Sequence, residues 1–436
     1  MASEDKASAA ELSPLRRYAA MVTLIVAGEA VFLLPFMIPR VFRPTLLEVL
    51  DLTNLEFGLA HAVYGVVAMV AYFFGGPLGD RFPARKMMAA ALLGTAAGGL
   101  LFARAPSLLT LELIYASWGL TTILLFWSPL IKATREWGGQ ADSGLAFGLL
   151  DGGRGLVAAV LASGGVALFG ALAGGAGGEA LETLDADTRA RALGAVILIV
   201  AGFTAAVALP VWWLIPEGPR DGSGEAEPGL SFAGVRAAAR SPAVWLLALI
   251  VLCAYVGYKS IDDVALYARD AHGYTELEAA KLGALTFWVR PVAALAAGVL
   301  ADRMRGSTIV TACFAIMLVG NLALASGALP PGAGLVLILT FAWTCLGVFG
   351  LRGVYFALFD EAAFPMSYTG SAVGLVSVLG YTPDVFMGPL MGALTEAAPE
   401  GNPGLGHQWL YGVIAAFGLL GLLASWAFGR AQASTA

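Results

Sequence analysis

Basic side chains interrupt several of the long apolar segments of this chain, and their chemistry is that of anion binding. A charged group at mid-bilayer is costly, so an intramembrane charge indicates a functional site. A guanidinium holds carboxylate, phosphate or sulfonate oxygens with paired hydrogen bonds. The predicted substrate-binding set consists of basic residues and two tyrosines of the apolar segments: Arg40, Tyr64, Arg154, Tyr258, Lys259, Arg290 and Arg352.

Three carboxylates of the apolar segments have a different possible role. Glu29, Asp151 and Asp384 are candidates for proton coupling, because a carboxylate within the membrane can load and release a proton as access alternates. The alternative is internal salt bridging. Asp151 and Arg154 are spaced to pair on one helix face. The sequence leaves both interpretations open.

Position along each span ranks the charges by depth, at a rise of about 1.5 Å per residue. Lys259 is expected toward the outside and Arg352 toward the cytoplasm. Arg40, Asp262 and Asp263 are expected near the outer ends of their spans, where side chains snorkel to the interface at lower cost.

The elements that must position these residues are predicted membrane helices. The chain has 436 residues, of which 58% are hydrophobic and only 13% charged, so lipid is the expected solvent. The apolar runs are continuous and do not alternate with period two, which favours helices over a closed barrel. The predicted spans are 17–40, 55–79, 86–105, 107–131, 143–172, 190–215, 242–265, 277–301, 307–327, 331–358, 369–395 and 408–430. The predicted fold class is therefore an all-α membrane protein with twelve transmembrane helices.

The predicted domain organisation places one six-helix bundle in each half of the chain. The first bundle covers 17–215 and the second covers 242–430, with short cytoplasmic tails at 1–16 and 431–436. Residues 216–241 are rich in Pro, Gly, Glu and Asp and are expected to form a cytoplasmic linker. Lys and Arg predominate in the loops on the side of the N-terminus, which predicts that both termini are cytoplasmic. The high Ala and Gly content favours a bacterial inner membrane.

One motif, G-x-L-x-D-R, occurs after the second helix of each half. The first copy contains Gly76, Asp80, Arg81 and Arg85, and the second contains Gly298, Asp302 and Arg303. Repeated bundles of this kind are expected of transporters. The motif resembles the signature loop of the major facilitator superfamily. That resemblance implies two pseudo-symmetric six-helix bundles that alternate access by rocking.

These seven residues are predicted to form a conformational gate. The glycines would let a neighbouring helix approach closely. The charges would pair across the bundles in one conformation and separate in the other. The alternative, that the charges only mark topology, stays open.

A second resemblance concerns the seventh predicted helix. Residues 255–267 are similar to the seventh helix of organophosphate–phosphate antiporters, a family that holds phosphate with one basic residue on helix 1 and one on helix 7. The resemblance implies these roles for Arg40 and Lys259. The family has Arg where Lys259 stands, and Arg40 aligns only with a gap. The expected substrate is therefore an organic anion rather than phosphate in particular.

The predicted function is secondary active transport of a small organic anion by alternating access, coupled to a proton or a counter-anion. A proton-coupled exporter of lipophilic compounds and a non-transporting membrane sensor are the alternatives. The absence of a G-x-x-x-x-G-K-[ST] motif argues against a primary pump.

Enzymatic activity and cofactors are not expected. His61, His272 and His407 are far apart in the sequence, and no H-E-x-x-H motif is present. Three cysteines within apolar segments predict neither a disulfide nor a metal site. The sequence contains no basic arm of the kind that binds nucleic acid. The expected partners are the lipid bilayer, the anionic substrate and the coupling ion, and the expected state is a monomer.

Overall fold

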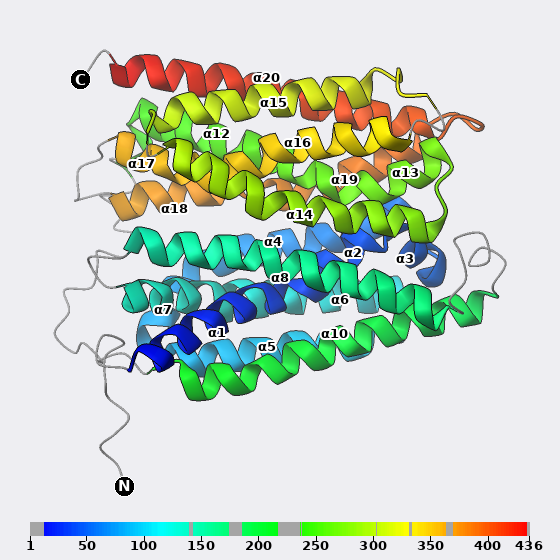
Figure 1. The fold of residues 1–436 in the computed structure, drawn as a ribbon, viewed down its shortest axis with the longest axis horizontal. Coiled ribbons are helices and arrows are strands. Elements are labelled where there is room, and N and C mark those ends of the chain that lie inside the picture. Colours follow the sequence, from blue (N-terminus) through cyan, green and yellow to red (C-terminus); the bar gives the residue numbers. More distant parts are fainter. Residues whose placement is uncertain are drawn as a thin grey trace, which may run out of the picture. The chain divides into compact units, whose positions relative to one another are not determined.

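Among the residues that the computed structural model describes, all regular structure is helical (Figure 1). The model describes residues 13–138, 143–173, 185–216, 236, 238–301, 303–330, 334–362 and 369–433. In lipid a helix satisfies every backbone group within its own segment, which is why continuous apolar runs adopt this structure.

The first half of the chain contains the first six expected spans. Span 1 comprises α1 (Pro14–Phe32), η2 (Leu33–Met37) and α2 (Ile38–Val41), and spans 2 and 3 are α4 (Asn54–Arg81) and α5 (Ala84–Phe102). Span 4 comprises α6 (Leu108–Gly119), η3 (Leu120–Trp127) and α7 (Ser128–Gly138), and spans 5 and 6 are α8 (Ser143–Leu172) and α10 (Ala186–Leu214). A short helix that was not predicted, α3 (Arg43–Leu50), follows span 1.

The second half of the chain contains the other six expected spans. Span 7 comprises α12 (Pro242–Lys259), η4 (Ser260–Asp263) and α13 (Val264–His272), and spans 8 and 9 are α14 (Glu276–Ala301) and α15 (Gly306–Ala325). Span 10 is α16 (Gly334–Val354), followed by η5 (Tyr355–Ala357) and α17 (Leu358–Glu361). Span 11 comprises α18 (Thr369–Gly380) and α19 (Pro383–Glu396), and span 12 is α20 (Gly404–Ala433).

The helices confirm the predicted spans. Among the described residues, 11 helical segments are long and apolar enough to cross a membrane. The remaining predicted span is α5, which has 19 residues and begins beside the charges of Arg85 and Lys86. The all-α membrane fold predicted from the apolar runs is therefore present.

Several spans change their helical geometry partway along. Spans 1 and 4 contain π-helical segments, η2 and η3, and span 7 contains the 3-10 segment η4. Pro35 lies in η2 and has no N–H to donate, which is a local reason for the irregular hydrogen bonding there. In span 11, Pro383 begins α19 after a two-residue turn at Tyr381 and Thr382. Such interruptions often occur at functional sites.

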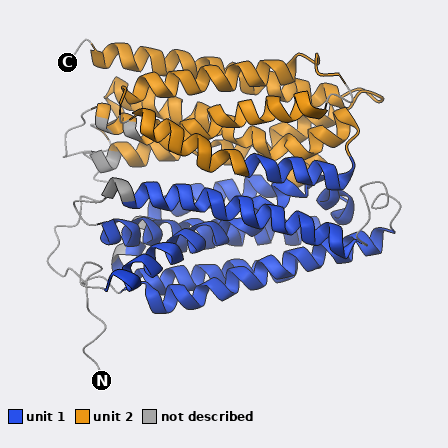
Figure 2. Cartoon of the chain, in the orientation of Figure 1, with its two compact units in different colours: residues 1–53, 59–223, 275–287 blue, residues 54–58, 224–274, 288–436 orange. Residues whose placement is uncertain are grey.

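The chain forms two compact units (Figure 2). Unit 1 comprises residues 1–53, 59–223 and 275–287, and unit 2 comprises 54–58, 224–274 and 288–436. Within unit 1, α1 packs against α8 and α10, and α5 packs against α10. Within unit 2, α12 packs against α18 and α20, and α15 packs against α16 and α20. Most of the predicted linker lies outside the described residues.

An ionic cluster links the first turns of α14 to the rest of unit 1. Arg189 Nη1 lies 2.6 Å from Glu48 Oε2 and 2.7 Å from Glu276 Oε1. Thr45 Oγ1 donates a hydrogen bond to Glu276 Oε2 at 2.6 Å. Glu276 is 3% exposed, so these contacts satisfy a buried carboxylate.

Candidate functional site

Unit 1 contains a buried ion pair between two predicted site residues. Arg154 Nε of α8 lies 3.3 Å from Glu29 Oε2 of α1. The guanidinium carbon of Arg154 also lies 5.5 Å from the ring centroid of Phe32 and 5.8 Å from that of Trp127. Gly28 makes this contact possible, because a Cβ there would lie 3.0 Å from Arg154 Cδ. Arg154 therefore has a carboxylate partner on another helix, beyond the predicted partner on its own.

The other predicted residues of unit 1 are distributed over three helices. The Tyr64 hydroxyl of α4 shares a hydrogen bond of 2.9 Å with Thr122 Oγ1 of η3. Arg40 of α2 is 2% exposed, and its guanidinium carbon lies 5.6 Å from the Phe287 ring centroid. Asp151 is partly buried on α8.

Unit 2 brings Lys259 and Asp384 together. Lys259 ends α12, and its Nζ lies 2.8 Å from Asp262 Oδ2 and 3.4 Å from Asp384 Oδ1. Asp384 is the second residue of α19, where the break at Tyr381 and Thr382 starts a new helix. A carboxylate in the first turn of a helix is favoured by the helix dipole. Lys259 thus has two carboxylate partners.

A cluster of tyrosines surrounds Arg352 of α16 in the same unit. The guanidinium carbon lies 4.1 Å from the ring centroid of Tyr258 and 5.7 Å from that of Tyr255. The Tyr355 and Tyr381 hydroxyls lie 3.4 Å from each other, and both tyrosines face Arg352. Nη1 of Arg352 is buried without a hydrogen-bond partner among the described residues. We call Arg352 and these four tyrosines the tyrosine cluster.

Tyr255 joins the tyrosine cluster to the Lys259 ion pairs. Its hydroxyl lies 3.0 Å from Asp384 Oδ2 and 3.2 Å from Asp384 Oδ1, while its ring faces Arg352. The depth ranking placed Lys259 and Arg352 toward opposite ends of their spans. The structure shows that long side chains bridge that difference and form one continuous polar network.

The expectation that charges near span ends snorkel is wrong for three residues. Arg40 is 2% exposed, Asp262 is 9% exposed and Asp263 is 0% exposed. Asp262 pairs with Lys259, and Asp263 lies 2.8 Å from His407. These two carboxylates contact partners inside the protein instead of the membrane–water interface.

Arg290 and the described gate residues lie on or next to α14, α4 and α5. Arg290 is 6% exposed on α14, and Arg81, at the end of α4, is exposed. Arg85 is the second residue of α5, with its guanidinium carbon 6.0 Å from the Trp212 ring centroid. The exposed Arg303 follows α14.

The close helix contact expected at Gly298 is not found. A Cβ at Gly298 would meet no described atom within 4 Å. The surroundings of Gly76, the side chain of Asp80 and the whole of Asp302 lie outside what the structure describes. The gating role of the two loops therefore stays a prediction.

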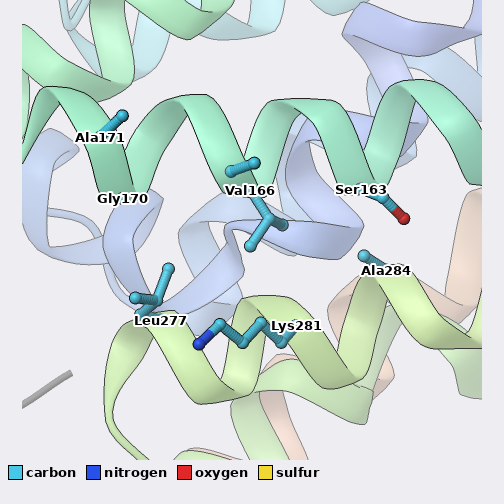
Figure 3. A pocket seen from close by; sticks show the side chains of 8 residues that line it. Ser163, Val166, Gly170, Ala171, Leu277, Lys281 and Ala284 are labelled. Carbon is cyan, nitrogen blue, oxygen red and sulfur yellow. The ribbon is translucent and has the colours of Figure 1, made fainter. Parts of the chain in front are cut away.

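A pocket of about 490 Å³ lies between α8 and the first turns of α14 in unit 1 (Figure 3). It is lined by Ser163, Val166, Ala167, Gly170, Ala171, Leu277, Lys281 and Ala284. Figure 3 shows the Lys281 nitrogen directed along α14 toward Leu277. No predicted anion-binding or proton-coupling residue lines this pocket, so the charged networks are the better candidate site.

Sequence reasoning missed several members of these networks. The spacing of Lys259 and Asp262 is a helical one and could have identified that pair. Tyr355 was not singled out, and the partners of His407 lie 137 and 144 residues away, so no local pattern reveals them.

Two curated relatives align with almost the whole chain. The inner membrane protein YqcE of Escherichia coli is 25% identical over 409 residues, covering 92% of each chain. The inner membrane protein YihN of the same organism is 24% identical over 419 residues, covering 94% of each chain.

Solved structures share the fold at low sequence identity. A bacterial homolog of the human lysosomal transporter Spinster, in an inward-facing and unoccupied conformation, gives a TM-score of 0.72 at 17% identity, covering 96% of this chain and 99% of that chain. The nucleoside transporter NupG gives a TM-score of 0.67 at 13% identity, covering 96% of this chain and 100% of that chain.

The family model described as Major Facilitator Superfamily matches residues 20–383. This match covers most of the chain and includes both copies of the D-R motif. It makes the chain a transporter rather than an enzyme, as the motif resemblance and the lack of a catalytic constellation led us to expect. The chain therefore belongs to the Major Facilitator Superfamily.

Proposed function

We propose that this protein is a secondary active transporter of a small organic anion and that Arg352 is its principal anion-binding group. The observation that carries the proposal is the environment of Arg352. Arg154 pairs with Glu29, and Lys259 pairs with two carboxylates. Arg352 forms no ion pair with any described carboxylate, and its Nη1 has no described hydrogen-bond partner.

A bound anion would satisfy this site. A buried N–H without a partner costs free energy, which a carboxylate, phosphate or sulfonate oxygen would recover. Tyrosine rings stabilise the guanidinium through cation–π contact. The hydroxyls of Tyr355 and Tyr381 lie beside it and can donate further hydrogen bonds to an anion.

Asp384 and Glu29 are the proposed proton-coupling residues, with Asp151 as a third candidate. Asp384 accepts a hydrogen bond from Tyr255 and lies next to Lys259, so its protonation would remove one of the two carboxylate charges that face Lys259. Glu29 has the corresponding relation to Arg154 in unit 1. A proton or counter-anion is the coupling ion in this scheme.

Alternating access would proceed by rocking of two six-helix bundles at 17–215 and 242–430. The loops at Asp80–Arg81 and at 302–303 would act as the gate. The loop charges favour cytoplasmic termini. The descriptions of the two Escherichia coli relatives support an inner membrane location. We propose a monomer, because one twelve-helix unit of this kind can work alone.

The test is anion binding by the purified protein, read as thermal stabilisation with a panel of small carboxylates, phosphates and sulfonates. A ligand at 100 times its Kd stabilises the native state by about 2.7 kcal/mol. We expect an anion to stabilise the wild type and the Arg430→Gln control, whose arginine is exposed on α20, but not the Arg352→Gln variant.

Two outcomes would overturn the proposal. Anion stabilisation that survives in Arg352→Gln would place the anion site elsewhere. Stabilisation by lipophilic cations and by no anion would favour the exporter alternative. Uptake of the stabilising anion into proteoliposomes then separates a transporter from a sensor, which would bind without accumulation.

The gate is tested separately from the anion site. We expect Asp80→Asn to slow uptake without weakening anion binding, because it would change the conformational step alone. Asp185→Asn, an exposed aspartate before α10, is the matched control. Equal uptake by both variants would refute the gating role of Asp80.

A further inference from the structure

A second titratable cluster lies in unit 2, outside the tyrosine cluster. His407 of α20 stands between two carboxylates: Nδ1 lies 2.8 Å from Asp263 Oδ2 of η4, and Nε2 lies 3.2 Å from Asp270 Oδ2 of α13. The side chains of His407 and Asp263 are fully buried, whereas that of Asp270 is 28% exposed. We call these three residues the acid–imidazole triad.

Aromatic groups enclose the triad. The Tyr267 ring centroid lies 5.4 Å from that of His407 and 5.3 Å from that of Tyr411. Phe341 of α16 closes the cluster against Tyr267 and Tyr411. Two titratable groups face the triad directly, Tyr267 of α13 and Tyr411 of α20. Two more face these tyrosines: His272 of α13 lies against Tyr267, and Cys345 of α16 lies near Tyr411. No described Lys or Arg pairs with Asp263 or Asp270.

Hydrogen-bond accounting favours a triad that holds an extra proton. A neutral imidazole has one donor and one acceptor, and an ionised carboxylate only accepts. Both ring nitrogens of His407 face carboxylate oxygens at hydrogen-bond distance. Both contacts are hydrogen bonds only when the triad carries one proton more than neutral histidine with two carboxylates. Imidazole is ordinarily the more basic group, so the proton resides on His407.

Loss of that proton changes both charge and geometry. One ring nitrogen would then present its lone pair to a carboxylate, and two negative charges would remain without a cation at a buried site. Asp263 and Asp270 lie on span 7, and His407 lies near the start of span 12. Deprotonation therefore weakens the attachment of α13 to α20.

The triad is connected both to the surface and to the proposed transport site. The partly exposed Asp270 gives a proton access to His407. At the other end, Asp263 is next in sequence to Asp262, which pairs with Lys259 at 2.8 Å. We propose that the triad is a further proton-binding site, separate from the carboxylates Asp384 and Glu29, and that η4 transmits its occupancy to Lys259. The transmission to transport depends on the proposed function, whereas proton binding by the triad does not.

The proton site can be tested without knowing the substrate. The chain has three histidines, so nitrogen-15 histidine labelling of the full-length protein in detergent gives three ring systems. His61→Gln and His272→Gln assign the spectrum and leave the triad intact. We expect His407 to be doubly protonated at neutral pH and to lose a proton at higher pH. We expect Asp270→Asn to shift that transition to lower pH.

Hydrogen–deuterium exchange tests the transmission through η4. After correction for intrinsic exchange, we expect uptake by residues 259–264 to rise across the pH range in which His407 titrates. In His407→Gln, uptake should not depend on pH. If His407→Gln does not fold, Asp270→Asn, which removes a partly exposed carboxylate, is used to repeat the test.

Each result bears on a separate claim. A neutral His407 from pH 6 to pH 9 would overturn the proton site. Titration of His407 with unchanged exchange at 259–264 would overturn the transmission. Failure of every anion to bind, together with a titrating His407, would refute the proposed anion transport but leave the proton site standing.

Discussion

Asp262 and Asp263 are consecutive residues whose carboxylates belong to two different networks. Asp262 Oδ2 lies 2.8 Å from Lys259 Nζ, and Asp263 Oδ2 lies 2.8 Å from His407 Nδ1. The 3-10 geometry of η4, with 3.0 residues per turn, turns adjacent side chains by about 120°. One short segment therefore fixes the relative position of Lys259 and the buried His407 imidazole.

The Glu29–Arg154 pair should contribute strongly to the stability of unit 1. Removing one partner of a buried ion pair leaves an uncompensated charge and costs about 3–5 kcal/mol. We expect Glu29→Gln to lower the thermal unfolding temperature, and the double variant with Arg154→Gln to recover part of the loss. A double-mutant cycle on the detergent-purified protein measures this coupling.

Glu400→Gln, which changes an exposed carboxylate, is the control for that cycle. Strictly additive effects of the two substitutions would show that Glu29 and Arg154 do not interact energetically.

The ring of Tyr258 should position Arg352 for anion binding. A buried cation–π contact contributes about 0.5–2 kcal/mol, which corresponds to roughly a 2- to 30-fold change in affinity. We expect Tyr258→Leu to weaken anion binding by that factor and Tyr258→Phe, which keeps the ring, to leave it nearly unchanged. Ligand titrations followed by thermal shift give the affinities. Equal losses in both variants would instead assign the effect to the hydroxyl.

Gly392 of α19 should tolerate no side chain. A Cβ at this position would overlap the backbone of Leu55 at the start of α4, in the same unit, and backbone atoms cannot move aside as a side chain can. We expect Gly392→Ala to lower the unfolding temperature by several degrees. Gly412→Ala on α20, where a Cβ meets no described atom within 4 Å, is the matched control.

Alanine is the better helix former, so the control should be neutral or slightly stabilising. A stable Gly392→Ala protein would mean that α4 and α19 can separate without cost.

The predicted orientation can be tested with single cysteines at exposed loop positions. Asp185→Cys, before α10, should react with a membrane-impermeant maleimide added outside the cell, and Arg305→Cys, before α15, should not. Both positions are exposed, so reactivity reports the side of the membrane. The native Cys253, Cys313 and Cys345 are buried and should stay unlabelled. The opposite labelling pattern would reverse the topology.

The sequence predicted most of the helical architecture because lipid imposes a strong local constraint. A continuous apolar run must be helical, so the predicted span 143–172 coincides with α8. Local constraints do not determine helix geometry, and the π-helical segment at 33–37 and the 3-10 segment at 260–263 were not anticipated.

The candidate site was predicted residue by residue but not as an arrangement. Lys259, Arg352 and Asp384 were identified because charge is rare and costly in the membrane. Their relation was not identified, because Tyr255 and Asp384 contact each other across 129 residues of sequence. Pairing of Arg154 with Asp151 on the same helix was one of two open interpretations, and the structure shows a further partner, Glu29, on another helix.

By itself, the sequence determined that this chain is a twelve-span membrane transporter with a duplicated G-x-L-x-D-R motif, because apolar length and local motifs are properties of contiguous residues. Only the tertiary structure decided which buried charges neutralise each other, because ion pairing depends on the distance between helices that are remote in sequence. The tertiary structure surrounds Arg352 with tyrosines and places His407 between two carboxylates.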